Sequence, residues 1–78
     1  MLFYVEHDDG NLYPYDTTNA SDRTEWLDEG NRYADVVACY KAEVFTNMVG
    51  FTAIGKRVTT EFVTGAMESA EAYSRGSK

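Results

Sequence analysis

Cysteine, proline and histidine are scarce in this chain, which contains one residue of each. Because disulfides need paired cysteines, the single Cys39 excludes a disulfide-stapled secreted mini-domain and is expected to be a buried, reduced thiol. A lone histidine leaves no second imidazole for a typical transition-metal site, so we expect no metal and no cofactor. Long apolar runs are also missing. The most apolar stretch, residues 36–54, is interrupted by Lys41, Glu43 and Asn47, which excludes a membrane span of about 20 residues.

Basic residues are few as well, 7 against 13 acidic ones in 78 residues, so the net charge is −6. A nonspecific nucleic-acid binder normally carries the opposite sign, and we expect no direct contact with nucleic acid. The sequence shows no basic start followed by an apolar run, the pattern of a signal peptide. We therefore expect a cytoplasmic protein with no membrane partner. The length corresponds to a single small domain over residues 1–78.

Negative charge is concentrated in the first half of the chain. Residues 1–35 contain nine acids and two bases, a net charge of −7, whereas residues 36–78 contain four acids and five bases, a net charge of +1. This asymmetry indicates a polarised surface, on which we expect Arg23 and Arg32 to orient neighbouring carboxylates. The alternative is an acidic face that only keeps a small protein in solution.

The first fifteen residues have the pattern of a β-hairpin. Residues 2–7 are β-branched and aromatic, and residues 12–15 form a second short apolar run. The segment 8–11, Asp-Asp-Gly-Asn, supplies residues that tolerate the positive φ angles of a tight turn. Pro14 has no N–H to donate, so we expect its strand at the edge of a sheet.

The middle of the chain has helical spacing. Asp22 and Glu25 resemble a capping box, which predicts the start of a helix. From Trp26, apolar residues recur every three or four positions as far as Val44. We therefore expect one continuous helical stripe, or two helices divided at Gly30-Asn31.

The remaining residues allow two structures. Residues 49–64 alternate as a second hairpin would with a turn at Gly55-Lys56, and they also keep a helical spacing into the Ala/Glu-rich run 66–73, which Gly76 ends. We predict an α+β fold in which the N-terminal hairpin packs on one or two main helices, with a loop near residues 50–55. The alternative is a ββαββα arrangement with a four-stranded antiparallel sheet.

Patterns associated with catalysis are incomplete. The segment Gly50 to Lys56 fits the first seven positions of a phosphate-binding loop, but Arg57 replaces the hydroxyl that binds the metal. Residues 6–9 combine three carboxylates with His7, and we interpret them as polar residues at a hairpin end rather than a metal or general-base site. Cys39 has no base nearby in sequence. We therefore predict no catalytic residues and no enzymatic activity.

The acidic half is the predicted binding surface. Its carboxylates imitate the row of charges along a nucleic acid, so we expect it to dock on and mask a basic surface of a nucleic-acid-binding protein or complex. In size and charge, and in no motif, the chain resembles small acidic proteins of bacterial viruses that block host nucleases, CRISPR complexes or transcription. The predicted partner-binding residues are Asp8, Asp9, Asp16, Asp22, Glu25, Trp26, Asp28, Glu29 and Asp35.

Trp26 has two interpretations at this stage. It is either an interface anchor inside a ring of carboxylates or a core tryptophan that packs on the hairpin. The alternative function is a small structural or oligomerising module, or an accessory subunit, held by aromatic and aliphatic packing. A homo-oligomer belongs to that alternative.

Overall fold

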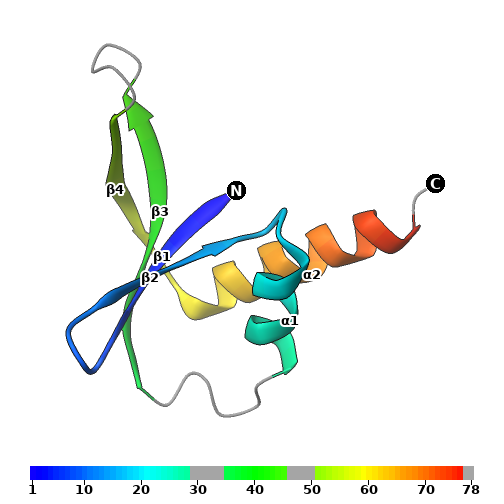
Figure 1. The fold of residues 1–78 in the computed structure, drawn as a ribbon, viewed down its shortest axis with the longest axis horizontal. Helices are drawn as coiled ribbons and strands as arrows, with labels where there is room; N and C mark the ends of the chain where they lie inside the picture. Colours follow the sequence, from blue (N-terminus) through cyan, green and yellow to red (C-terminus); the bar gives the residue numbers. More distant parts are fainter. Residues whose placement is uncertain (29–34, 46–50, 77–78) are drawn as a thin grey trace.

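The computed structural model describes residues 1–28, 35–45 and 51–76. In these ranges the elements follow one another as β1 (Leu2–His7), β2 (Leu12–Asp16), α1 (Ala20–Asp28), β3 (Val36–Phe45), β4 (Phe51–Val58) and α2 (Thr60–Gly76) (Figure 1). The strands form one antiparallel sheet in the order β2-β1-β3-β4. The predicted α+β class and N-terminal hairpin are confirmed, and the sheet has the four strands of the ββαββα alternative.

The β1–β2 hairpin forms as its sequence predicts. Gly10 has a φ of +85°, in the left-handed region that favours glycine, and its N–H donates to the carbonyl of His7 at 2.9 Å. The N–H of Asn11 donates to Asp9 Oδ1 at 2.8 Å, which further holds the turn. Pro14 lies on β2, which is the edge strand next to β1, as expected for a residue without an N–H.

Helix α1 begins earlier and ends sooner than the sequence pattern indicates. It starts at Ala20 because Asn19, not Asp22, is its N-cap: Asn19 Oδ1 accepts a hydrogen bond from the N–H of Asp22 at 3.1 Å. The helix ends at Asp28. The predicted division at Gly30-Asn31 lies outside the described residues.

The predicted continuation of the helical stripe to Val44 is wrong. Residues Val36–Phe45 form β3, in which Tyr40 pairs with Tyr4 of β1 and Cys39 pairs with Val5. The apolar positions of this segment fit both a period of 3.6 and a period of 2. Its β-branched and aromatic residues favour the strand, and pairing with a strand on each side provides partners for its backbone groups.

Strand β4 overturns the predicted turn at Gly55-Lys56 and the predicted loop near residues 50–55. Gly55 lies inside β4, at a register shift between β3 and β4. A Cβ at this position would lie 2.7 Å from the backbone oxygen of Lys41 and would overlap the side chain of Glu43. Glycine is required here by close packing between strands, not by a turn. Gly50 lies outside the described residues.

Helix α2 confirms the helical prediction for residues 66–73 and ends at Gly76 beside Arg75, as predicted. Its N-terminus is capped by Thr59, whose Oγ1 accepts a hydrogen bond from the N–H of Phe62 at 3.1 Å. Neither of the helices in the described part of the chain has the length and apolar character needed to cross a membrane.

The core lies between one face of the sheet and both helices. Its buried members are Phe3, Val5, Tyr15, Trp26, Cys39, Val63 and Met67. These residues come from β1, β2, α1, β3 and α2, so each of these elements contributes apolar area to one cluster. Full burial of such a side chain stabilises the fold by roughly 1.5–3 kcal/mol. Cys39 is buried as expected, and this burial raises the pKa of its thiol.

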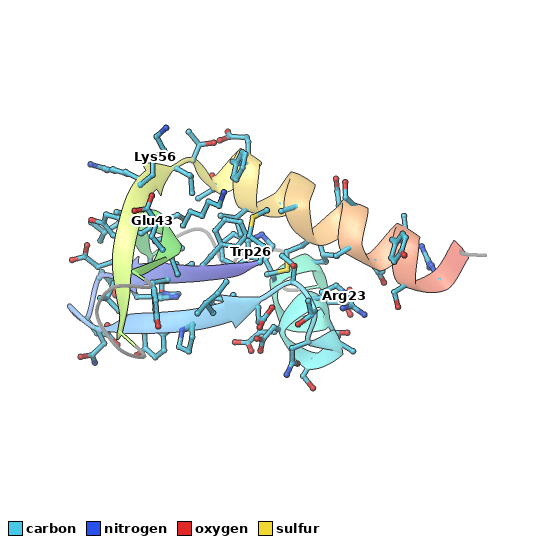
Figure 2. All side chains as sticks on the ribbon, turned by 90° about the horizontal axis from the view of Figure 1, so that it is seen from above. Arg23, Trp26, Glu43 and Lys56 are labelled. Atoms are coloured by element: carbon cyan, nitrogen blue, oxygen red, sulfur yellow. The ribbon has the colours of Figure 1, made fainter. Side chains whose placement is uncertain are left out.

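Trp26 lies near the middle of the molecule, between α2 and the strands (Figure 2). Only 1% of it is exposed, its Nε1–H donates to Thr64 Oγ1 at 3.0 Å, and its ring contacts the Tyr15 ring edge-on at 5.2 Å between centroids. The interpretation of Trp26 as a core residue packed on the hairpin is confirmed. The prediction that it anchors a partner is wrong, because its side chain presents almost no surface.

Candidate functional site

A polar pocket of about 250 Å³ lies where the hairpin, α1 and the start of β3 come together. It combines three of the predicted acids with the histidine and two tyrosines, and we call it the acidic pocket. Its lining residues are His7, Asp9, Tyr13, Tyr15, Glu25 and Asp35. None of the described residues that line the pocket is a lysine or an arginine, so their combined formal charge is negative whenever the carboxylates are ionised.

The aromatic wall of the acidic pocket follows from the register of the hairpin. Tyr13 pairs with Val5 and Tyr15 pairs with Phe3, which places both tyrosines on the face of the sheet that carries the core. His7 is on the same face, and its ring contacts the Tyr13 ring edge-on with 4.8 Å between centroids. Three aromatic rings on neighbouring strands therefore line one side of the site.

Asp9, one of the lining residues, is held in place by hydrogen bonds. The hydroxyl of Tyr13 donates to Asp9 Oδ2, and the N–H of Asn11 donates to Oδ1. The Tyr13 hydrogen bond, followed by the Asn11 backbone, lowers the pKa of Asp9 below its ordinary value of 3.8. The same hydrogen bond raises the pKa of Tyr13. At neutral pH Asp9 is thus a carboxylate and Tyr13 a neutral phenol.

The pKa of Tyr15 reflects the carboxylates that lie around its hydroxyl. Its hydroxyl donates to Glu25 Oε2 at 3.2 Å. Burial raises the pKa of Tyr15 to about 12, with further contributions from the charge and hydrogen bond of Glu25 and from the charges of Asp22 and Asp35. Carboxylates from α1 and from the start of β3 therefore act on one phenol of β2.

Asp35 connects the start of β3 to the hairpin. Its Oδ1 lies 3.1 Å from His7 Nδ1, and its backbone carbonyl accepts a hydrogen bond from the N–H of Asp8 at 2.8 Å. About half of the Asp35 side chain is exposed. The carboxylate is thus fixed in place by the hairpin and remains accessible to a partner.

Asp16 and Asp22 belong to the connection between β2 and α1. Asp16 Oδ1 accepts from the N–H and hydroxyl of Thr18, and the N–H of Asp16 donates to Asp22 Oδ2 at 2.8 Å. The hydrogen bonds from Thr18, that of its backbone N–H first, lower the pKa of Asp16. Both carboxylates already accept hydrogen bonds that stabilise the fold.

The other predicted acids lie around the acidic pocket or outside the described residues. Asp8 is exposed in the hairpin turn, next to Asp9. Asp28 is exposed on α1 and, together with Glu25, lines a shallow depression beside the acidic pocket. Glu29 lies outside the described residues. The structure thus brings Asp9, Glu25 and Asp35 into one pocket, with Asp28 and Asp8 at its margins.

Arg23 does not pair with the acidic pocket. Its Nη1–H donates to the carbonyl of Thr17 at 2.8 Å, on the side of α1 that faces away from the hairpin turn (Figure 2). The expectation that Arg23 orients neighbouring carboxylates is wrong, because the guanidinium instead joins α1 to the segment after β2. Arg32, for which the same role was expected, lies outside the described residues.

The side chains that line the pocket are of the kinds that attract a cationic group. Carboxylates accept hydrogen bonds from guanidinium or ammonium groups, and aromatic rings add cation–π attraction. Within the described ranges, no group of three or more His, Cys, Asp and Glu side chains is arranged to hold a metal ion.

Sequence reasoning missed His7, Tyr13 and Tyr15 as members of the site. The signal was present in the predicted hairpin, because alternate residues of paired strands share one face. Applied to residues 7, 13 and 15, that rule places all three side chains together. The contribution of Glu25 and Asp35 depends on packing between elements that are distant in sequence.

Comparison with known protein families, with curated proteins and with solved structures found no match to this chain.

Proposed function

We propose that this protein is a non-enzymatic, acidic binding protein that docks on a basic, nucleic-acid-binding surface of a protein partner and masks it. The observation that carries the proposal is the convergence of Asp9, Glu25 and Asp35 in a pocket whose described lining residues include no lysine or arginine. An arginine side chain of the partner fits this chemistry, since its planar guanidinium forms paired hydrogen bonds to a carboxylate and stacks on a tyrosine ring.

The kind of partner follows from the arrangement of charge. The exposed Asp8 and Asp28 extend the negative surface beyond the pocket along the hairpin turn and α1. A surface built to hold a nucleic-acid backbone presents several basic side chains in a row, and such a row is complementary to dispersed carboxylates. In this role the protein is a nucleic-acid mimic, of the kind that a bacterial virus uses to inhibit host defence or transcription.

Electrostatic docking of this type associates quickly and weakens with salt. The experiment is to immobilise the protein, pass a bacterial lysate over it at low and at high salt, and identify the retained proteins by mass spectrometry. We expect nucleic-acid-binding proteins to be retained at low salt and released at high salt. Retention of no basic protein at low salt would refute the proposal.

Two matched variants separate the acidic pocket from general acidity. Glu25→Gln/Asp35→Asn removes two charges from the pocket. The amide oxygen of Gln at position 25 can still accept the hydrogen bond from the Tyr15 hydroxyl. Glu43→Gln/Glu71→Gln removes two charges from β3 and α2, and neither residue lines the pocket. We expect the pocket variant to slow association with the captured partner about tenfold or more and the control to change it little. Equal effects of the two variants would contradict a specific role of the pocket.

A further inference from the structure

We propose that two copies of this chain associate through α2, packed antiparallel, so that the apolar face of α2 is a homodimer interface. This inference goes beyond the proposed function. Among the described residues, none lines both the α2 groove and the acidic pocket. A dimer formed in this way leaves both acidic pockets open to a partner.

Helix α2 is apolar on two sides. One side packs into the core through Val63 and Met67, both fully buried. The other side lines a groove of about 670 Å³ together with Met1 and Thr17. At its ends lie two large exposed rings, Phe62, of which 48% is exposed, and Tyr73, of which 83% is exposed.

The second half of α2 extends past the sheet and past α1 (Figures 1 and 2). Between the two exposed rings the groove is lined by the small residues Gly65, Ala66, Ser69 and Ala70. Small side chains allow the axis of a second helix to approach closely, and the two rings then supply most of the buried apolar area.

The shape of α2 favours a second copy of itself as the occupant. A Cβ on Gly65 would meet no atom within 4 Å, so space is open above this residue. Tyr73 follows eight residues later, and Ser69 lies halfway between them. In an antiparallel pair centred on Ser69, each Tyr73 ring therefore lies over Gly65 of the other copy.

The charged residues of α2 are also arranged symmetrically, about a point close to Ser69. Glu61 and Arg75 lie in the first and last turns of the helix, almost four turns apart and therefore on one side. Glu68 lies halfway between them, one residue from Ser69, a difference of about 1.5 Å along the axis. None of these three residues lines the groove, so they lie along one flank of the antiparallel pair, where each Arg75 comes level with Glu61 of the other copy. Such self-complementarity is what a two-fold interface requires.

The same arrangement also makes a repulsive contact. Because Glu68 lies on this flank, close to the level of the two-fold axis, the Glu68 side chains of the two copies come near one another. Removal of this charge should tighten the dimer, whereas removal of an acid outside α2, in a chain with a net charge of −6, should act only through screened, long-range repulsion.

The test is sedimentation of the full chain over a range of concentrations, with charge-reversal variants. We expect a reversible dimer that Glu61→Arg or Arg75→Glu weakens about tenfold each, since each change replaces two attractive pairs with repulsive ones. The double variant Glu61→Arg/Arg75→Glu should restore dimerisation to within about threefold of the parent. Glu68→Gln should tighten the dimer severalfold.

Tyr73→Ala is the decisive packing variant. Tyr73 is largely exposed in the single chain, so its removal should leave thermal unfolding in dilute solution unchanged while it abolishes the dimer. Glu25→Gln/Asp35→Asn, which tests the proposed function, should leave dimerisation as it is. A parent chain that stays monomeric at every concentration overturns the inference. So does a dimer that tolerates Tyr73→Ala, or a double reversal that fails to restore association.

Discussion

At the scale of single residues, Tyr15 joins the core to the acidic pocket. Its ring packs against Trp26, and its hydroxyl donates to Glu25 at the pocket surface. Because the ring is buried and three carboxylates act on its hydroxyl, ionisation of Tyr15 is strongly opposed. The pKa of Tyr15 therefore depends both on the packing of its ring and on the charges of the acidic pocket.

Tyr15 should ionise at about pH 12 instead of its ordinary value of 10. Since the folded state holds this proton more tightly than the unfolded chain does, its contribution to stability is complete below pH 10. It is lost as the pH rises from about 10 to 12. Glu25→Gln should lower the pKa of Tyr15 part of the way back, because the burial remains. Tyrosinate absorbance against pH measures this, with Tyr15→Phe to identify the step, and an unchanged pKa in Glu25→Gln would contradict the assigned contact.

At the scale of elements, two glycines in regular structure have opposite roles. Gly55 in β4 is pressed against the backbone of Lys41 and the side chain of Glu43, so a Cβ has no room. Gly65 in α2 has open space around the position of a Cβ. The first glycine is required by the packing of β4 on β3, whereas the second lowers the intrinsic stability of its helix.

Gly55→Ala should therefore destabilise the protein by about 1–3 kcal/mol, since the sheet must shift to admit the methyl group. Gly65→Ala is the matched control and should stabilise the monomer by up to about 1 kcal/mol. Urea unfolding in dilute solution measures both changes. Equal tolerance of alanine at the two positions would show that β4 does not approach β3 as closely as described.

At the scale of the whole molecule, stability depends on one small core to which β1, β2, α1, β3 and α2 contribute. A domain of 78 residues has a limited reserve of stability, on the order of 5 kcal/mol. Loss of one buried side chain should therefore affect every element together, including those that form the acidic pocket, because unfolding of so small a domain is cooperative.

Met67→Ala should remove about 2–5 kcal/mol of stability, through lost burial and the cavity left behind. Met67 is fully buried and lies between the helices and the sheet, so a loss at the upper end of this range leaves a large fraction of the chain unfolded at 37 °C. Phe62→Ala, a change at a half-exposed position on the same helix, is the comparison and should cost less. Circular dichroism during thermal unfolding measures both. Similar melting temperatures for the two variants would contradict the assigned core.

Local chemistry was sufficient to predict the hairpin and the end of α2. Gly10 and Pro14 restrict the backbone through their own covalent structure, and Gly76 follows an uninterrupted helical run, so neither prediction needed a distant contact. The acidic residues of the proposed binding surface were also visible in the sequence, although Trp26 was wrongly included among them and two of the carboxylates, Asp16 and Asp22, hold the β2–α1 connection.

The amino-acid sequence by itself determined the α+β class, the first hairpin, the C-terminal helix and the concentration of negative charge in residues 1–35. Only the tertiary structure decided that Val36–Phe45 is a strand, since its apolar spacing fits two periods and hydrogen bonding to β1 and β4 selects one. The tertiary structure also decided which carboxylates share a pocket. The packing of α1 on the hairpin places Glu25, and the pairing of β3 with β1 places Asp35. These placements arise from contacts between residues far apart along the chain, which local propensity does not encode.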